Sequence, residues 1–124
     1  SPRGHTMKAF TTITTTIANA ASLSGEISLD SWTVEAIIMP AAWTTANLTF
    51  QAAEASGGTY NNLYNDGGNE VTVTAAVDRY ISLVGDDKDS LATARWLKVR
   101  SGTSGTAVNQ GAERTIRLVL RKDW

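Results

Sequence analysis

Apolar and polar side chains alternate one by one in two segments near the C-terminus, residues 94–102 (ARWLKVRSG) and 114–122 (RTIRLVLRK). A period of two residues is typical of a β-strand with one buried face. If the two strands pair, one side of the resulting ribbon is aliphatic and closes a core, while the other side is basic. The basic side is our candidate docking surface, which consists of Trp96, Lys98, Arg100, Arg117 and Arg121.

Other short segments have the alternation or the β-branched composition of strands, and turns rich in glycine, asparagine and aspartate separate them. They are residues 10–17, 23–29, 32–39, 48–52, 59–64, 70–75 and 78–84. We expect 32–39 to be a central strand covered on both faces, with Val34 and Ala36 on the same side. Residues 85–90 are expected to form a solvated loop, and 89–95 is the one helical candidate. We therefore predict an all-β fold, a single antiparallel, jelly-roll-like β-sandwich of about eight strands.

The length of 124 residues suits one domain. Residues 1–7 (SPRGHTM) resemble a vector-derived tag, and we expect an N-terminal extended arm or edge strand at 8–22 and the sandwich domain at 23–124. The chain has no cysteine, so it has no disulfide or thiolate metal site. No apolar run is long enough for a membrane helix, and no signal peptide is visible. We expect no membrane partner.

Charge is distributed unevenly along the chain. Residues 1–90 carry 4 basic and 10 acidic side chains, whereas residues 91–124 carry 7 basic and 2 acidic ones. Such a dipolar molecule either orients against a charged partner or satisfies its charges internally. An acidic chain with one aromatic side chain on its basic side does not favour nucleic acid as a partner. The same side suits docking to an acidic protein.

The usual catalytic motifs are missing. The one histidine, His5, belongs to the expected tag, so the common pairs of nucleophile and base are absent. Four glutamates, Glu26, Glu35, Glu54 and Glu70, are candidates for a carboxylate pair that hydrolyses a glycoside. Their alternating positions fit solvated faces better. We expect neither enzymatic activity nor a cofactor.

Oxygen ligands of the kind that calcium prefers cluster in residues 65–70 (NDGGNE) and 86–89 (DDKD). The first segment equally suits a hairpin turn, in which asparagine and glycine supply positive φ angles. In the second segment, Lys88 would oppose a cation. Neither segment matches an EF-hand loop, and we expect no metal site.

Two segments carry a family resemblance. They are residues 40–73 (PAAWTTANLTFQAAEASGGTYNNLYNDGGNEVTV) and 95–120 (RWLKVRSGTSGTAVNQGAERTIRLVL). Together they resemble a family of short head decoration or head-fibre-type proteins from the structural-gene regions of tailed bacteriophages and prophages. The first segment is also similar to discoidin-type jelly rolls, which often bind sugars through their end loops. On that likeness, the candidate ligand-loop aromatics are Trp43, Tyr60 and Tyr64.

The phage resemblance implies a non-enzymatic virion structural protein that decorates or stabilises the capsid surface, or forms the base of a head fibre. Its implied partners are the major capsid protein or another virion protein, together with further copies of itself, trimers being one expected form. The implied location is the virion surface, after synthesis in the host bacterial cytoplasm. Residues 10–17 are a candidate for a strand supplied to a neighbour. The alternative is a carbohydrate-binding module of a phage tail or fibre, with a glycan as the partner.

Overall fold

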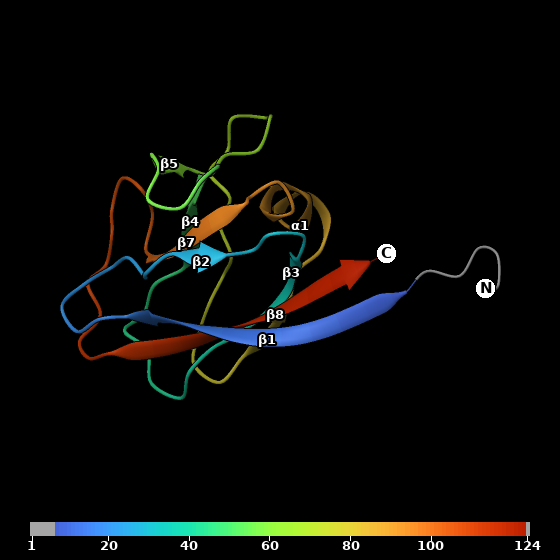
Figure 1. Cartoon of the computed structure of the whole chain (residues 1–124). Helices are drawn as coiled ribbons and strands as arrows, with labels where there is room; N and C mark the ends of the chain where they lie inside the picture. The colour runs from blue at the N-terminus through green and yellow to red at the C-terminus, as the bar shows by residue number, and fades with distance from the viewer. Residues whose placement is uncertain (1–6, 124) are drawn as a thin grey trace.

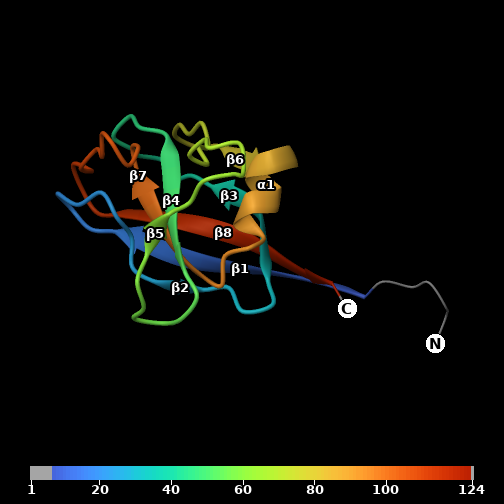
Figure 2. The same ribbon diagram turned by 90° about the horizontal axis from the view of Figure 1, so that it is seen from above.

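Eight strands and one short helix make up the computed structural model, which describes residues 7–123 (Figure 1). The strands form two four-stranded antiparallel sheets that pack face to face (Figure 2). The first sheet has the order β1-β8-β3-β6, and the second has the order β2-β7-β4-β5. The predicted all-β antiparallel sandwich is confirmed. Of the expected tag, only Met7 lies within the described residues. The elements are β1 (Lys8–Ile17), β2 (Ile27–Ser28), β3 (Thr33–Ile38), β4 (Leu48–Ala53), β5 (Asn61–Asn62), β6 (Tyr80–Ser82), α1 (Gly85–Leu91), β7 (Trp96–Ser101) and β8 (Arg114–Asp123).

The two longest strands, β1 and β8, pair along their whole length. The ladder runs from Lys8 opposite Asp123 to Ile17 opposite Arg114, without a break in register. Threonine and isoleucine dominate β1, and these β-branched residues suit a pleated, half-buried surface. β1 lies at the edge of the first sheet, whereas β8 lies inside it, between β1 and β3.

The two alternating C-terminal segments do not pair with each other. β7 pairs with β4 and β2 in the second sheet, while β8 pairs with β1 and β3 in the first sheet. Leu97 and Val99 of β7 and Leu118 of β8 are all buried, as the alternation predicts. Two strands that each have one aliphatic face can lie side by side in one sheet, or they can lie in two sheets whose aliphatic faces pack against each other. The chain adopts the second arrangement.

A β-bulge in β3 changes which side chains share a face. Val34 lies opposite Leu120 and Ala36 lies opposite Val119, so Glu35 is the extra residue on β3. The bulge shifts the alternation by one position. The expectation that Val34 and Ala36 lie on the same side is therefore wrong, because Ala36 shares the outer face with Val119.

The segment 85–90, expected to be a loop, forms most of helix α1. Asp86 and Asp87 lie in its first turn, where carboxylates favour a helix, and Leu91 at its end is fully buried. The strands expected at 59–64 and 70–75 are much reduced. The first is represented by the two residues of β5, and the second only by isolated bridges such as Val73 with Leu48.

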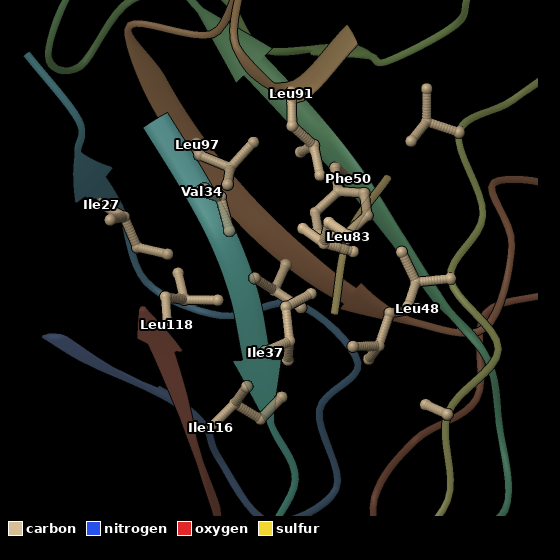
Figure 3. Packing of buried hydrophobic residues seen from close by; sticks show 14 of the residues in the cluster. Ile27, Val34, Ile37, Leu48, Phe50, Leu83, Leu91, Leu97, Ile116 and Leu118 are labelled. Atoms are coloured by element: carbon tan, nitrogen blue, oxygen red, sulfur yellow. The ribbon is translucent and has the colours of Figure 1, made fainter. Parts of the chain in front are cut away.

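The core lies between the sheets and extends under the helix (Figure 3). Aliphatic side chains from the first sheet face Phe50, Leu97 and other side chains of the second sheet, and Leu91 of α1 joins the same cluster. Because this apolar interior is continuous, a site has to be built on the outer faces of the two sheets or on the loops and the helix. Within residues 7–123, no helix has the length and apolar character needed to cross a bilayer.

Candidate functional site

The structure divides the expected basic surface between two opposite sides of the molecule. Trp96, Lys98 and Arg100 alternate with the buried Leu97 and Val99, so they lie on the outer side of the second sheet. Arg117 and Arg121 lie on the outer side of the first sheet, since they alternate with the buried residues of β8. The five residues therefore do not form one docking surface. The physical reason is that β7 and β8 belong to different sheets.

Arg100 is a structural residue that is only 7% exposed. Its Nη2 donates to Asn62 Oδ1 at 2.6 Å, and its Nη1 donates to Thr49 Oγ1 at 3.3 Å and to Glu70 Oε2 at 3.4 Å. Glu70 Oε1 also accepts the backbone N–H of Ser104 at 3.1 Å. Arg100 and Glu70 thus tie β5 and two loops to the outer side of the second sheet.

Lys98 and Tyr60 also have partners within the chain. The Lys98 ammonium lies 4.5 Å from the centre of the Tyr60 ring, a cation–π contact. The Tyr60 hydroxyl donates to Glu26 Oε1 at 2.8 Å, and Glu26 also accepts hydrogen bonds from the Gly57 N–H and the Ser56 hydroxyl. Burial, and then the bond to Glu26, raises the pKa of Tyr60 to about 12. The Gly57 N–H, followed by the two hydroxyls, lowers the pKa of Glu26.

Of the three candidate ligand-loop aromatics, Trp43 is buried and belongs to the hydrophobic core cluster. Its Nε1 donates to the carbonyl of Ala46 at 2.9 Å. The adjacent Thr44 is held by the buried Gln110, which accepts the Thr44 N–H and donates to the Thr44 carbonyl. Trp43 is therefore part of the packing. Tyr64 is the most exposed of the three, at 49%.

Tyr64 lines a hollow of about 420 Å³ at the junction of the 65–70 loop and helix α1. Asn65, Asp66, Asp86 and Asp89 are among the other lining residues. The fold thus brings together the two segments considered for calcium. Within residues 7–123, however, no three histidine, aspartate or glutamate side chains are grouped as metal ligands would be. The hollow adds no support to a calcium site.

Three of the four candidate carboxylates are held by donors of the chain itself. Glu26 accepts from the 56–60 turn, Glu35 accepts from Lys88 and Arg121, and Glu70 accepts from Arg100 and the 103–106 turn. These contacts anchor loops or join elements. The fourth, Glu54, lines a separate hollow together with Arg95.

The outer side of the first sheet carries a hollow of about 340 Å³ that extends across all four strands. Its lining includes Phe10 from β1, Val119 from β8, Ala36 from β3, Tyr80 from β6 and Val84 just before α1. Phe10, Tyr80 and Val84 are 61%, 65% and 73% exposed. Large apolar side chains gathered at one exposed place make this hollow a candidate interaction site. We call these five residues the docking face.

An ionic cluster borders the docking face. Glu35, the extra residue of the β3 bulge, accepts from Lys88 Nζ at 3.0 Å and from Arg121 Nη1 at 3.3 Å, both through Oε1. Glu35 Oε2 is buried and has no hydrogen-bond partner in the described part of the chain. Arg121 also binds Asp123 at 2.8 Å, and this hydrogen bond lowers the pKa of the Asp123 carboxyl. The cluster thus joins the bulge of β3 to α1 and β8.

Sequence reasoning missed the docking face, although a signal for it exists. Phe10 occupies a polar-side position among threonines, and Val119 lies between Arg117 and Arg121 on the side expected to face water. Apolar side chains at positions that the alternation assigns to solvent are the informative exceptions. Tyr80 becomes recognisable as a third one only when the pairing of β6 with β3 is known.

Comparisons of the chain with models of known protein families, with curated proteins and with solved structures found no match.

Proposed function

We propose that this chain is a non-enzymatic structural protein of a phage particle, which attaches to the capsid or to another virion protein through the docking face. The observation that carries the docking role is the exposure of Phe10, Tyr80 and Val84 around one hollow. Buried apolar anchors supply most of the binding energy at protein interfaces. The assignment to a phage particle rests on the resemblance of residues 40–73 and 95–120 to phage structural proteins.

The composition of the docking face suggests the chemistry of the partner. Its centre is apolar, and its charged border is already paired within the chain through Glu35, Lys88 and Arg121. A complementary surface would therefore present mainly apolar side chains. Such attachment depends mainly on burial of apolar area, so it should change little with ionic strength.

Substitution of Tyr80 by aspartate, or of Val84 by aspartate, is expected to weaken attachment by at least about tenfold, because each change puts a charge into an apolar interface. The measurement is co-sedimentation of the purified protein with empty capsids that lack it, over a range of protein and salt concentrations. Val77→Asp is the matched control, since Val77 is exposed but lies outside the hollow. Its attachment should equal that of the wild type.

Two results of this experiment would contradict the docking face. One is equal attachment of the Tyr80, Val84 and Val77 variants. The other is attachment that falls steeply with salt and is lost on Arg117→Glu, which would indicate docking through the exposed cationic side chain of β8.

The second candidate function is carbohydrate binding, favoured by the exposure of Tyr64 in its polar hollow. An aromatic ring beside amide and carboxylate oxygens is an arrangement that can stack on a sugar ring and bind its hydroxyls. If this is the function, a glycan array should give a specific signal that Tyr64→Ala removes. Tyr80→Ala, which changes an exposed tyrosine outside this hollow, should keep the signal. A blank array with the wild-type protein would exclude the arrayed glycans as ligands.

A further inference from the structure

The sandwich has three short edge strands and one long one. β6 at one edge of the first sheet has 3 residues, and β2 and β5 at the edges of the second sheet have 2 residues each. β1, at the remaining edge, has 10 residues. Very short edges are one way in which proteins prevent their sheets from pairing with other chains. Of the four edge strands, only β1 is too long to be protected in this way.

Apart from Lys8 at its first position, β1 also lacks three other features that protect an edge, which are charged residues, proline and β-bulges. Between residues 9 and 17 (AFTTITTTI) there is no charged residue, no proline and no glycine. Its ladder with β8 has no bulge, in contrast to that of β3. The single charge of the strand, on Lys8, lies at its first position opposite Asp123. A long, regular edge without these devices is a template for another strand.

We propose that β1 pairs with β1 of a second copy of this chain, antiparallel, about a two-fold axis at Ile13. In this register the two residue numbers of each cross-strand pair add up to 26. The inward-facing Ile13 therefore lies opposite Ile13 of the second copy, Thr11 lies opposite Thr15, and Ala9 lies opposite Ile17. The strand is thus nearly palindromic on its inner side. Such cross-strand pairs of β-branched residues stabilise a sheet.

The outer side of β1 is self-complementary in the same register. Thr12 meets Thr14 of the second copy, and Phe10 meets Thr16. Lys8 falls opposite position 18, beyond the strand, so the pairing opposes no like charges. This symmetry favours a second copy over an unrelated strand as the occupant.

The pairing closes after two copies. A two-fold axis uses both β1 edges, and the other edge of the first sheet is only the 3 residues of β6, so the extended sheet does not propagate further. The product is a continuous eight-stranded sheet with both docking faces on the same side. The dimer forms without any virion partner, so its test is independent of the proposed function.

Charged pairs at positions 12 and 14 test both the interface and its register. The Thr12→Glu/Thr14→Glu variant places two glutamates of one copy against two of the other, and its dimer dissociation constant should rise by at least about tenfold. The Thr12→Lys/Thr14→Glu variant places lysine against glutamate twice and should remain dimeric. In the monomer both positions are exposed, opposite Val119 and Arg117 of β8, so both variants should fold.

Sedimentation velocity over a concentration series gives the mass and the dissociation constant of each variant, and thermal unfolding checks the fold. A wild-type dimer that the first variant dissociates and the second preserves supports the proposal. A wild-type protein that stays monomeric, a trimer, or equal behaviour of the two variants overturns it.

Cross-linking provides a second measurement. The chain has no cysteine, so Ile13→Cys introduces a single thiol at the proposed axis. Directly opposed residues in an antiparallel pair have Cα atoms about 4.5–5.5 Å apart, within the range of a disulfide. Mild oxidation should link Ile13→Cys into dimers much faster than Thr103→Cys, a control in an exposed turn. Equal rates overturn the register.

Discussion

Replacing Gly102 by alanine is expected to lower the free energy of unfolding by about 3 kcal/mol. Gly102 has a φ of +91°, and an added Cβ would lie 2.5 Å from the carbonyl oxygen of Thr106 and 2.7 Å from the nitrogen of Val108. These are backbone atoms of the same turn. They cannot move away easily, because Val108 N donates to Ser101 O and Gly102 N donates to Asn47 O. Urea denaturation of the variant measures the loss.

Gly105→Ala is the matched control within the same turn. An added Cβ at Gly105 meets no atom within 4 Å, and its φ lies outside the strained region. Its stability should therefore stay within about 0.5 kcal/mol of the wild type. If both alanine variants lose the same stability, the short distance between a Cβ at position 102 and the backbone of Thr106 and Val108 does not explain why glycine occurs there.

The second large effect is expected at Arg100. Arg100→Met keeps the apolar stem of the side chain but removes the guanidinium, so the largely buried Glu70 carboxylate loses its cationic partner and the Asn62 oxygen loses its shortest hydrogen bond. Breaking a buried ion pair from one side costs about 3 kcal/mol, which corresponds to a fall in melting temperature of roughly 10 °C for a domain of this size. Thermal and urea denaturation measure both quantities.

A double-mutant cycle separates the lost ion pair from a general loss of packing. Adding Glu70→Gln to Arg100→Met removes the uncompensated charge and should recover part of the stability. The single Arg100→Met variant should still attach to capsids at temperatures at which it is folded. If Arg100→Met is as stable as the wild type, Arg100 has no structural role. If the folded variant fails to attach to capsids, Arg100 takes part in docking.

The sequence was sufficient to predict the all-β fold class, because polar side chains that face solvent alternate with apolar side chains that face the core along its strands. Leu97 and Val99 are buried and Lys98 lies on the outer side, as their alternation predicts. Alternation describes a strand's own faces and does not identify its neighbours. For that reason the sequence did not reveal that β7 and β8 lie in opposite sheets, or that residues on them considered as one surface lie on opposite sides of the sandwich.

Predictions from local sequence composition were also wrong where a contact between distant residues determines the structure. The acidic segment 85–90 has the composition of a solvated loop, yet the burial of Leu91 holds it against the core as a helix. The bulge at Glu35 likewise has no signal in the periodicity, because the extra residue is defined only relative to Val119 and Leu120 on β8. The docking face depends on this bulge, which turns Ala36 outward.

The pairing of β1 with β8 joins the two ends of the described chain and therefore has a kinetic consequence. During synthesis, β1 emerges before β8, its one partner strand among the described residues, has been made. Folds dominated by such distant pairings typically form in roughly milliseconds to seconds, much more slowly than helical bundles. The β1–β8 ladder can therefore form only after β8 has been synthesised, and until then β1, which is rich in threonine and isoleucine, lacks its partner strand.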